Sequence, residues 1–215
     1  MMTNRIHTRL IGILFILPFF FYGGGNALID SVLQASNYLS VLPQHKNMFI
    51  LGALLMLLNS LDVAAIGVLS FPLIAKHSKN TAYGYMIGRI AEAMLAAVGV
   101  VSLLCIMTIA DNTSSGGLSG AAEMLAVLAQ KANYWLYQTA MMALCVGSIG
   151  FCVILWKFHI IPAALALMML VGYIVLLLGV ILEFFGYSVG VICSVPGGLC
   201  EIGFGAWLLV KGMRE

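Results

Sequence analysis

Residues 83–92 read YGYMIGRIAE, and residues 93–110 continue as AMLAAVGVVSLLCIMTIA. The second segment carries no charge, and it nearly reaches the ~20 apolar residues that a helix needs to cross the hydrocarbon core of a bilayer. The first segment places Arg89 and Glu92 three residues apart, so both lie on one face of a helix. The stretch therefore predicts a membrane-spanning helix with one charged face.

The composition of the whole chain agrees with this stretch. Of its 215 residues, 62% are hydrophobic and 8% are charged, and the mean hydropathy is +1.07. A soluble domain has roughly 25% charged residues. Apolar residues form continuous runs rather than alternating with polar ones, which favours helices over a barrel. The sequence predicts an all-α integral membrane protein, and its net charge of +2 gives no support to nucleic-acid binding.

Six apolar runs account for nearly the whole chain, which we interpret as one membrane domain over residues 1–215. The predicted spans are 10–29, 48–71, 83–110, 134–156, 162–182 and 196–210. Pro72 is expected to end the second span, and residues 119–133 are expected to form a short amphipathic helix on the membrane surface, capped by Ser119. The first run partly matches a secretory signal peptide, but it is longer than the usual ~7–15 apolar residues. A retained first helix is therefore expected.

Basic residues predict the orientation in the membrane. One set of loops and termini contains Arg5, Arg9, Lys76, Lys79, Lys157, Lys211 and Arg214, and the other set contains Lys46 and Lys131. Cytoplasmic loops carry an excess of lysine and arginine. Both termini are therefore predicted to be cytoplasmic.

Four charged residues fall inside the predicted spans, namely Asp62, Arg89, Glu92 and Glu201. At ~1.5 Å per residue, the three acids all lie about 13–15 Å from the inner ends of their helices. Asn59 lies one turn from Asp62 on the same helix face. Because an isolated charge in lipid costs about 2.5–3.5 kcal/mol or more, we expect these five residues to form one buried polar cluster. Three acids against one arginine also predict that Asp62 or Glu201 carries a proton.

Three roles are open for this cluster. It can be a structural brace, a site for a small ligand, or a site for proton coupling. The leading functional hypothesis is a non-enzymatic membrane protein that binds a small ligand or a membrane partner protein. A small secondary transporter or proton-linked permease is the alternative. An intramembrane enzyme comes third, because no nucleophile or metal site accompanies the acids.

No cofactor or metal is expected. All four histidines lie outside the predicted spans, which excludes a haem held by two histidines between helices. Gly84 and Gly88 permit close helix approach, and they leave oligomerisation open.

The five cysteines are interpreted mainly as packing residues. Cys193 and Cys200 lie near the outer end of the last predicted span. They are candidates for a disulfide if both reach an oxidising compartment.

Several short motifs occur together in a characteristic order. They are Phe71-Pro72-Leu73 before a basic loop, Gly84-Tyr85, the run from Arg89 to Ala93, Ile161-Pro162, and Glu201 followed by the run from Trp207 to Gly212. In this order they resemble the bacterial domain-of-unknown-function family 4386 of small multi-pass membrane proteins. His159 and Ala163 depart from the basic residues expected around the proline. The resemblance covers most of the chain and implies a six-helix protein of the bacterial inner membrane, without implying an activity.

Overall fold

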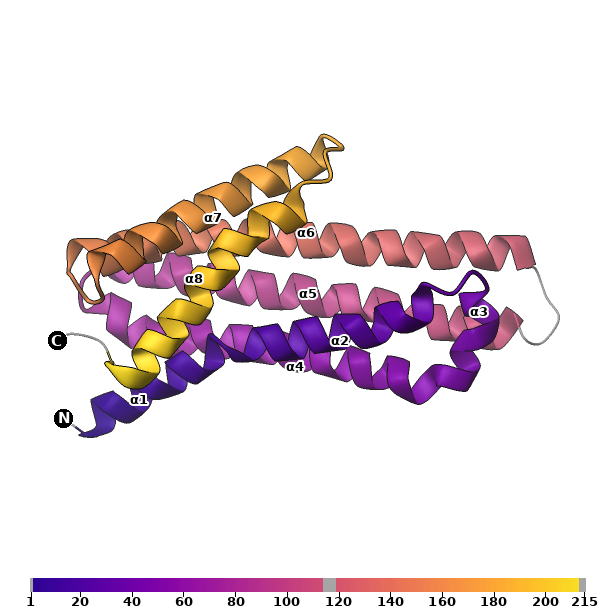
Figure 1. Ribbon diagram of the computed structural model, residues 1–215, viewed down its shortest axis with the longest axis horizontal. Coiled ribbons are helices and arrows are strands. Elements are labelled where there is room, and N and C mark those ends of the chain that lie inside the picture. The colour runs from indigo at the N-terminus through magenta and orange to yellow at the C-terminus, as the bar shows by residue number, and fades with distance from the viewer. Residues whose placement is uncertain (1, 114–118, 213–215) are drawn as a thin grey trace. The chain divides into compact units, whose positions relative to one another are not determined.

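The computed structural model describes residues 2–113 and 119–212, which form helices joined by short turns and contain no strand. The helices are α1 (Met2–Leu14), α2 (Leu17–Leu33), α3 (Tyr38–Val41), the 3₁₀ helix η1 (Leu42–His45), α4 (Lys46–Ala75), α5 (Lys79–Thr113), α6 (Ser119–Lys157), α7 (Ala163–Phe184) and α8 (Gly190–Val210) (Figure 1). The predicted all-α fold is confirmed.

Six helical stretches of the described chain are long and apolar enough to cross a membrane. They are Arg5–Leu33, Tyr38–Ala75, Lys79–Asn112, Gly120–Lys157, Ala163–Phe184 and Gly190–Val210. Large apolar side chains are exposed on these helices, for example Leu61 at 69%, Ile87 at 61% and Val146 at 64%. Exposed apolar surface on this scale is unusual in a soluble monomer and is expected for a multi-pass membrane protein.

The described chain divides into two compact units. The first unit comprises Met1–Leu17, Asp62–Ala93 and Gln138–Glu215, and the second comprises Pro18–Leu61 and Met94–Tyr137. Each unit has its own hydrophobic core, which includes Phe151 and Phe204 in the first unit and Phe49 and Ile106 in the second. Helices α4, α5 and α6 each contribute one segment to each unit.

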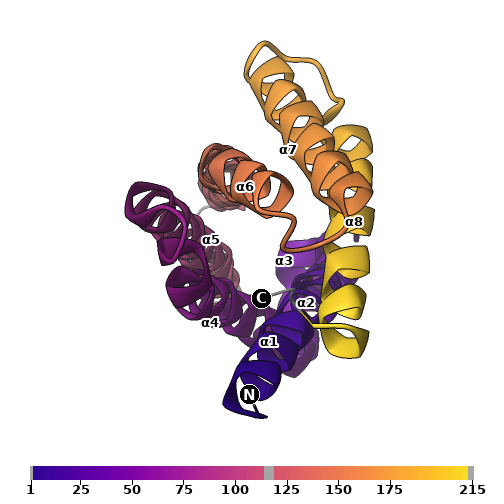
Figure 2. The same cartoon turned by 90° about the vertical axis from the view of Figure 1, so that its left-hand side faces the viewer.

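Within the first unit, α8 packs against both α7 and α1 (Figures 1 and 2). Gly12 and Gly205 form the contact between α1 and α8, since a Cβ on either would lie 2.8 Å from the carbonyl oxygen of the other. On the other side of α8, a Cβ on Gly172 would lie 2.8 Å from the Cα of Gly197. Glycine at these positions therefore allows the helix backbones to approach closely.

The first predicted span, residues 10–29, is divided between two helices. α1 ends at Leu14 and α2 begins at Leu17, directly before Pro18. Proline has no N–H to donate and its ring clashes with the carbonyl four residues earlier, here that of Leu14, which explains a break at this point.

Two other predicted boundaries are wrong. Pro72 lies inside α4, which continues to Ala75. Residues 119–133 are not a separate helix, because α6 runs without interruption from Ser119 to Lys157. The side chain of Ser119, the predicted cap, lies outside the described residues.

Helix α8 begins at Gly190, earlier than the predicted start at residue 196, and Pro196 lies within it. Glu183 explains this start, because its Oε1 accepts a hydrogen bond of 2.6 Å from the backbone N–H of Gly190. A carboxylate at this position satisfies a donor that the first turn leaves unpaired, and it interacts favourably with the helix dipole.

The early start of α8 overturns the predicted disulfide. Cys193 and Cys200 lie on the same helix, where seven residues separate their Cα atoms by about 10 Å. A disulfide requires a Cα separation below about 7 Å. Both cysteines are free thiols.

Candidate functional site: a buried arginine cluster

The centre of the site is Arg89 on α5, whose side chain is 3% exposed. Its Nη1 donates a hydrogen bond of 2.9 Å to Oε2 of Glu92, one turn later on the same helix. In water such a pair would stabilise a helix by only a few tenths of a kcal/mol. Here both partners are buried, so each charge offsets the cost of removing the other from water.

Glu201 on α8 is the second carboxylate of the site. Its Oε1 lies 3.9 Å from Nη2 of Arg89 and accepts a hydrogen bond of 2.6 Å from the hydroxyl of Tyr173 on α7. Three helices therefore contribute polar groups that contact one another.

Tyr173 was not predicted as a site residue, although the sequence contains a signal for it. It lies ten residues after the start of α7 at Ala163, which places it about 15 Å along the helix. The charged residues were predicted at this same depth. If tyrosine hydroxyls had been compared by depth together with the charged groups, Tyr173 would have been identified as a site residue.

Aromatic rings enclose the guanidinium group. The Cζ of Arg89 lies 5.4 Å from the ring centroid of Phe15 and 5.8 Å from that of Tyr85. Tyr85 stacks on Phe151 at 4.4 Å, and Phe15 packs edge-on against Phe204 at 4.8 Å. These contacts contribute cation–π attraction and keep water away, which strengthens the ionic interactions inside.

Helix α4 approaches the same arginine through Gly67, where a Cβ would lie 2.8 Å from the Cβ of Arg89. Asp62, also on α4, is 6% exposed. Neither of its carboxylate oxygens has a hydrogen-bond partner in the described part of the chain. Asp62 is near enough to interact electrostatically with Arg89 and Glu92, but no ion pair joins it to a described residue.

The structure thus brings together three of the five residues that the sequence singled out, namely Arg89, Glu92 and Glu201. Asp62 lies in the same unit, and its carboxylate has no hydrogen-bond partner among the described residues. Asn59 belongs to the second unit, and its side-chain oxygen is buried without a hydrogen bond among the described residues.

The acids do not converge on one point. Among residues 2–113 and 119–212, no three His, Cys, Asp or Glu side chains lie close enough together to hold a metal ion. The arrangement is instead a chain of contacts from Tyr173 through Glu201 and Arg89 to Glu92. Such a chain can hold helices together, and its carboxylates can also accept protons.

Comparison with known proteins gives one match. The family model described as "Domain of unknown function (DUF4386)" matches residues 10–212, nearly the whole chain. The comparisons with curated proteins and with solved structures gave no match.

Proposed function

We propose, from the premise that the chain belongs to the DUF4386 family, that it is a non-enzymatic multi-pass membrane protein that binds an exchangeable proton in its buried cluster. The family description assigns no activity, so the proposal rests on the residues of this chain. The bacterial inner membrane as location and the cytoplasmic position of both termini are part of the same proposal. They rest on the resemblance and on the distribution of lysine and arginine.

The unpartnered carboxyl group of Asp62 is the observation that carries the proposal. An ionised carboxylate that is buried without hydrogen bonds is far more costly than a neutral carboxyl group. Glu92 and Glu201 both have partners, whereas Asp62 has none in the described residues. A proton on Asp62 would remove its charge without needing any other partner.

The tight enclosure of the cluster supports a proton rather than a larger ligand. Arg89 is 3% exposed, and the rings of Phe15, Tyr85, Phe151 and Phe204 around it are almost completely buried. Hydroxyl and carboxyl groups can pass protons along hydrogen bonds without opening a cavity.

A structural brace makes the opposite prediction for Asp62. A brace depends on contacts, and Asp62 makes no hydrogen bond or ion pair with the described residues. If the cluster only holds helices together, Arg89, Glu92 and Glu201 are needed and Asp62 is dispensable.

The proposal is tested by infrared spectroscopy of the full-length protein in lipid nanodiscs at neutral pH. The carbonyl stretch of a protonated carboxylic acid is expected in the wild-type spectrum, shifted in D₂O and lost in Asp62→Asn. Asp111→Asn is the matched control, because its side chain is 56% exposed and belongs to the other unit, and it should leave the band unchanged. A band that survives Asp62→Asn, or that is lost only in Glu201→Gln, would contradict the assignment to Asp62.

Proton-linked transport is the second candidate function. The charged groups of the cluster come from three helices, α4, α5 and α8. A change of protonation would therefore alter contacts between different helices, which favours proton-linked transport. In proteoliposomes that contain a pH-sensitive dye, an imposed pH gradient should decay faster with wild type than with Asp62→Asn. Equal decay in vesicles with and without protein would count against proton conduction, while the infrared result would still decide proton binding.

A further inference from the structure

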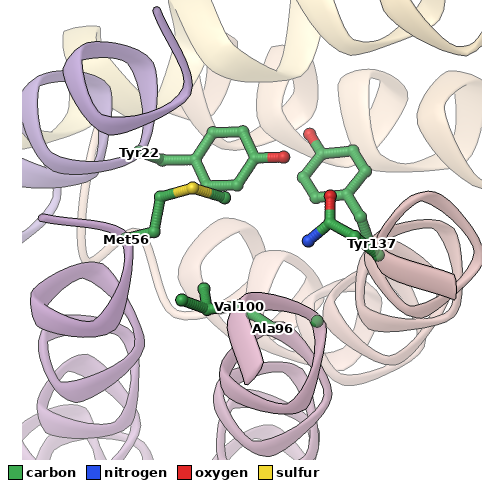
Figure 3. Close-up of a pocket in the computed structure, with 7 residues that line it drawn as sticks. Tyr22, Met56, Ala96, Val100 and Tyr137 are labelled. Carbon is green, nitrogen blue, oxygen red and sulfur yellow. The ribbon is translucent and has the colours of Figure 1, made fainter. Parts of the chain in front are cut away.

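A pocket in the second unit is too small for an organic ligand. Tyr22 and Tyr137 line it, and their rings stack on each other with centroids 5.0 Å apart (Figure 3). The space beside the rings is ≈ 10 Å³, which is about what one water molecule needs. A larger ligand therefore has no place there.

The exposed cations of the first unit have no exposed acids beside them among the described residues. The six exposed cations are Arg5, Arg9, Lys76, Lys79, Lys157 and Lys211. None of them forms an ion pair with a described residue. The second unit differs, because its Lys46 pairs with Asp111 at 3.9 Å. The first unit therefore presents positive charge that the described chain does not balance.

The lysines of this surface lie at the ends of long apolar helices. Lys79 is the first residue of α5, Lys157 is the last residue of α6, and Lys76 directly follows α4. Exposed aromatic side chains accompany them, with Trp156 at 44% before Lys157 and Tyr83 at 51% one turn after Lys79. Basic and aromatic side chains at the ends of membrane-spanning helices lie at the level of the lipid headgroups.

Contact between two turns assembles part of this surface. The turn from α4 to α5 contains His77, and the turn from α6 to α7 contains Phe158; the centroids of these two rings are 4.2 Å apart. Lys76 directly precedes His77, and Lys157 directly precedes Phe158. The contact therefore brings together two backbone segments that each carry a lysine. We call residues 76–79 and 157–159 the two-turn surface.

Hydrogen bonds of the backbone fix both turns. After α6, the N–H of His159 donates to the carbonyl oxygen of Trp156 at 3.2 Å, and the N–H of Ile160 donates to that of Leu155 at 3.1 Å. With a φ of 53° at His159, this is the Schellman motif that closes many helices. In the other turn, Oγ of Ser78 accepts a hydrogen bond of 3.3 Å from the backbone N–H three residues later. The lysines therefore project from defined backbone positions.

We propose that the two-turn surface binds the headgroup of an anionic phospholipid. The ammonium groups of Lys76 and Lys157 donate hydrogen bonds to the phosphate oxygens and balance their charge. A basic cluster directly beside the end of a membrane span is the pattern expected for anionic lipids. A zwitterionic headgroup would bring its own cation close to the lysines, so the anionic lipid is preferred. The surface shares no residue with the buried arginine cluster.

The test is native mass spectrometry of the full-length protein in detergent, titrated with phosphatidylglycerol or phosphatidylcholine that has the same acyl chains. Wild type should bind phosphatidylglycerol more tightly. Because each lysine near an anionic headgroup contributes about fivefold in affinity, Lys76→Gln/Lys157→Gln should weaken phosphatidylglycerol binding about 25-fold. Phe158→Ala changes no charge but removes the contact with His77, and it should weaken binding about two- to tenfold.

Lys46→Gln/Lys131→Gln is the matched control, because it removes the same charge from the second unit. It should keep the preference of wild type for phosphatidylglycerol. Equal weakening by the two double variants would show that net charge alone attracts the lipid and would overturn the proposal. Wild-type binding by Phe158→Ala, or displacement of phosphatidylglycerol by an equal concentration of inorganic phosphate, would also overturn it.

Discussion

Tyr173 and Glu201 show how one hydrogen bond can connect two helices at the centre of the first unit. Tyr173→Phe removes the hydroxyl that donates at 2.6 Å to the Glu201 carboxylate. We expect the free energy of unfolding to fall by about 0.6–2 kcal/mol, the range for such bonds between membrane helices. Unfolding in mixed detergent micelles measures the change. Tyr187→Phe is the control, since Tyr187 is 61% exposed, and an equal effect of both variants would contradict this role of Tyr173.

Arg89 should be the least replaceable residue of the cluster. Arg89→Leu would leave Glu92 buried without its 2.9 Å partner, and removal of one member of a buried pair typically costs about 3–5 kcal/mol. The double variant Arg89→Leu/Glu92→Leu should recover part of that loss, because it no longer leaves Glu92 unpaired, whereas Glu201 still loses its 3.9 Å contact with Arg89. The same unfolding assay compares the two. A double variant that is as unstable as Arg89→Leu would show that the pair is not the source of the cost.

The depth of charged residues along their helices predicted much of this site. It could not predict which groups would touch, because equal depth does not fix the rotation of each helix about its axis. Arg89 and Glu92 share one helix face, so their contact follows from spacing alone. The contact with Glu201 and the unpaired state of Asp62 depend on how α8 and α4 pack, which the local sequence does not specify.

At the scale of helices, glycine residues determine how closely two helices pack. Gly205→Ala would place a methyl group 2.8 Å from the carbonyl oxygen of Gly12, an atom of the backbone that cannot move without shifting α1. We expect a clear fall in the unfolding midpoint. Gly203→Ala on the same helix should be neutral or slightly stabilising, because its Cβ would lie 3.8 Å from a side-chain carbon of Leu165, an ordinary van der Waals contact. Equal effects of both substitutions would show that the α1–α8 contact tolerates added volume.

The number and approximate positions of the long helices could be predicted from the sequence, but their ends could not. Apolar composition marks the part of a helix that suits lipid, whereas backbone hydrogen bonding continues beyond it. α6 is the clearest case, since the predicted span began at residue 134 and the helix begins at Ser119. The start of α8 depends on Glu183, which lies outside that helix.

The length of α6 leads to a prediction about its surroundings. Its 39 residues correspond to about 58 Å, whereas a hydrocarbon core of about 30 Å covers roughly 26 residues even at a tilt of ~40°. We expect the first ~13 residues to lie outside the core. In a background without Cys105 and Cys193, Glu123→Cys should react with a membrane-impermeant maleimide, and Val146→Cys should not. If neither introduced cysteine reacts with the maleimide, the start of α6 lies within lipid.

At the scale of the whole molecule, the described chain has two units with separate cores, and the contacts of the arginine cluster lie in the first unit. The infrared band of the protonated acid should therefore be insensitive to substitutions in the second unit. Gly99→Ala, a substitution in the second unit, is expected to keep this band. Loss of the band in Gly99→Ala would reveal energetic coupling between the two units.

The unequal helix lengths have a consequence for the choice of lipid. α7 and α8, with 22 and 21 residues, are about 32 Å long and only just match an average bilayer, whereas α5 and α6 have residues to spare. Longer acyl chains would therefore create hydrophobic mismatch first at α7 and α8. These two helices carry Tyr173 and Glu201. Acyl-chain length would thus act most directly on the pair that completes the buried cluster, and membrane thickness becomes a variable that any assay of this site must control.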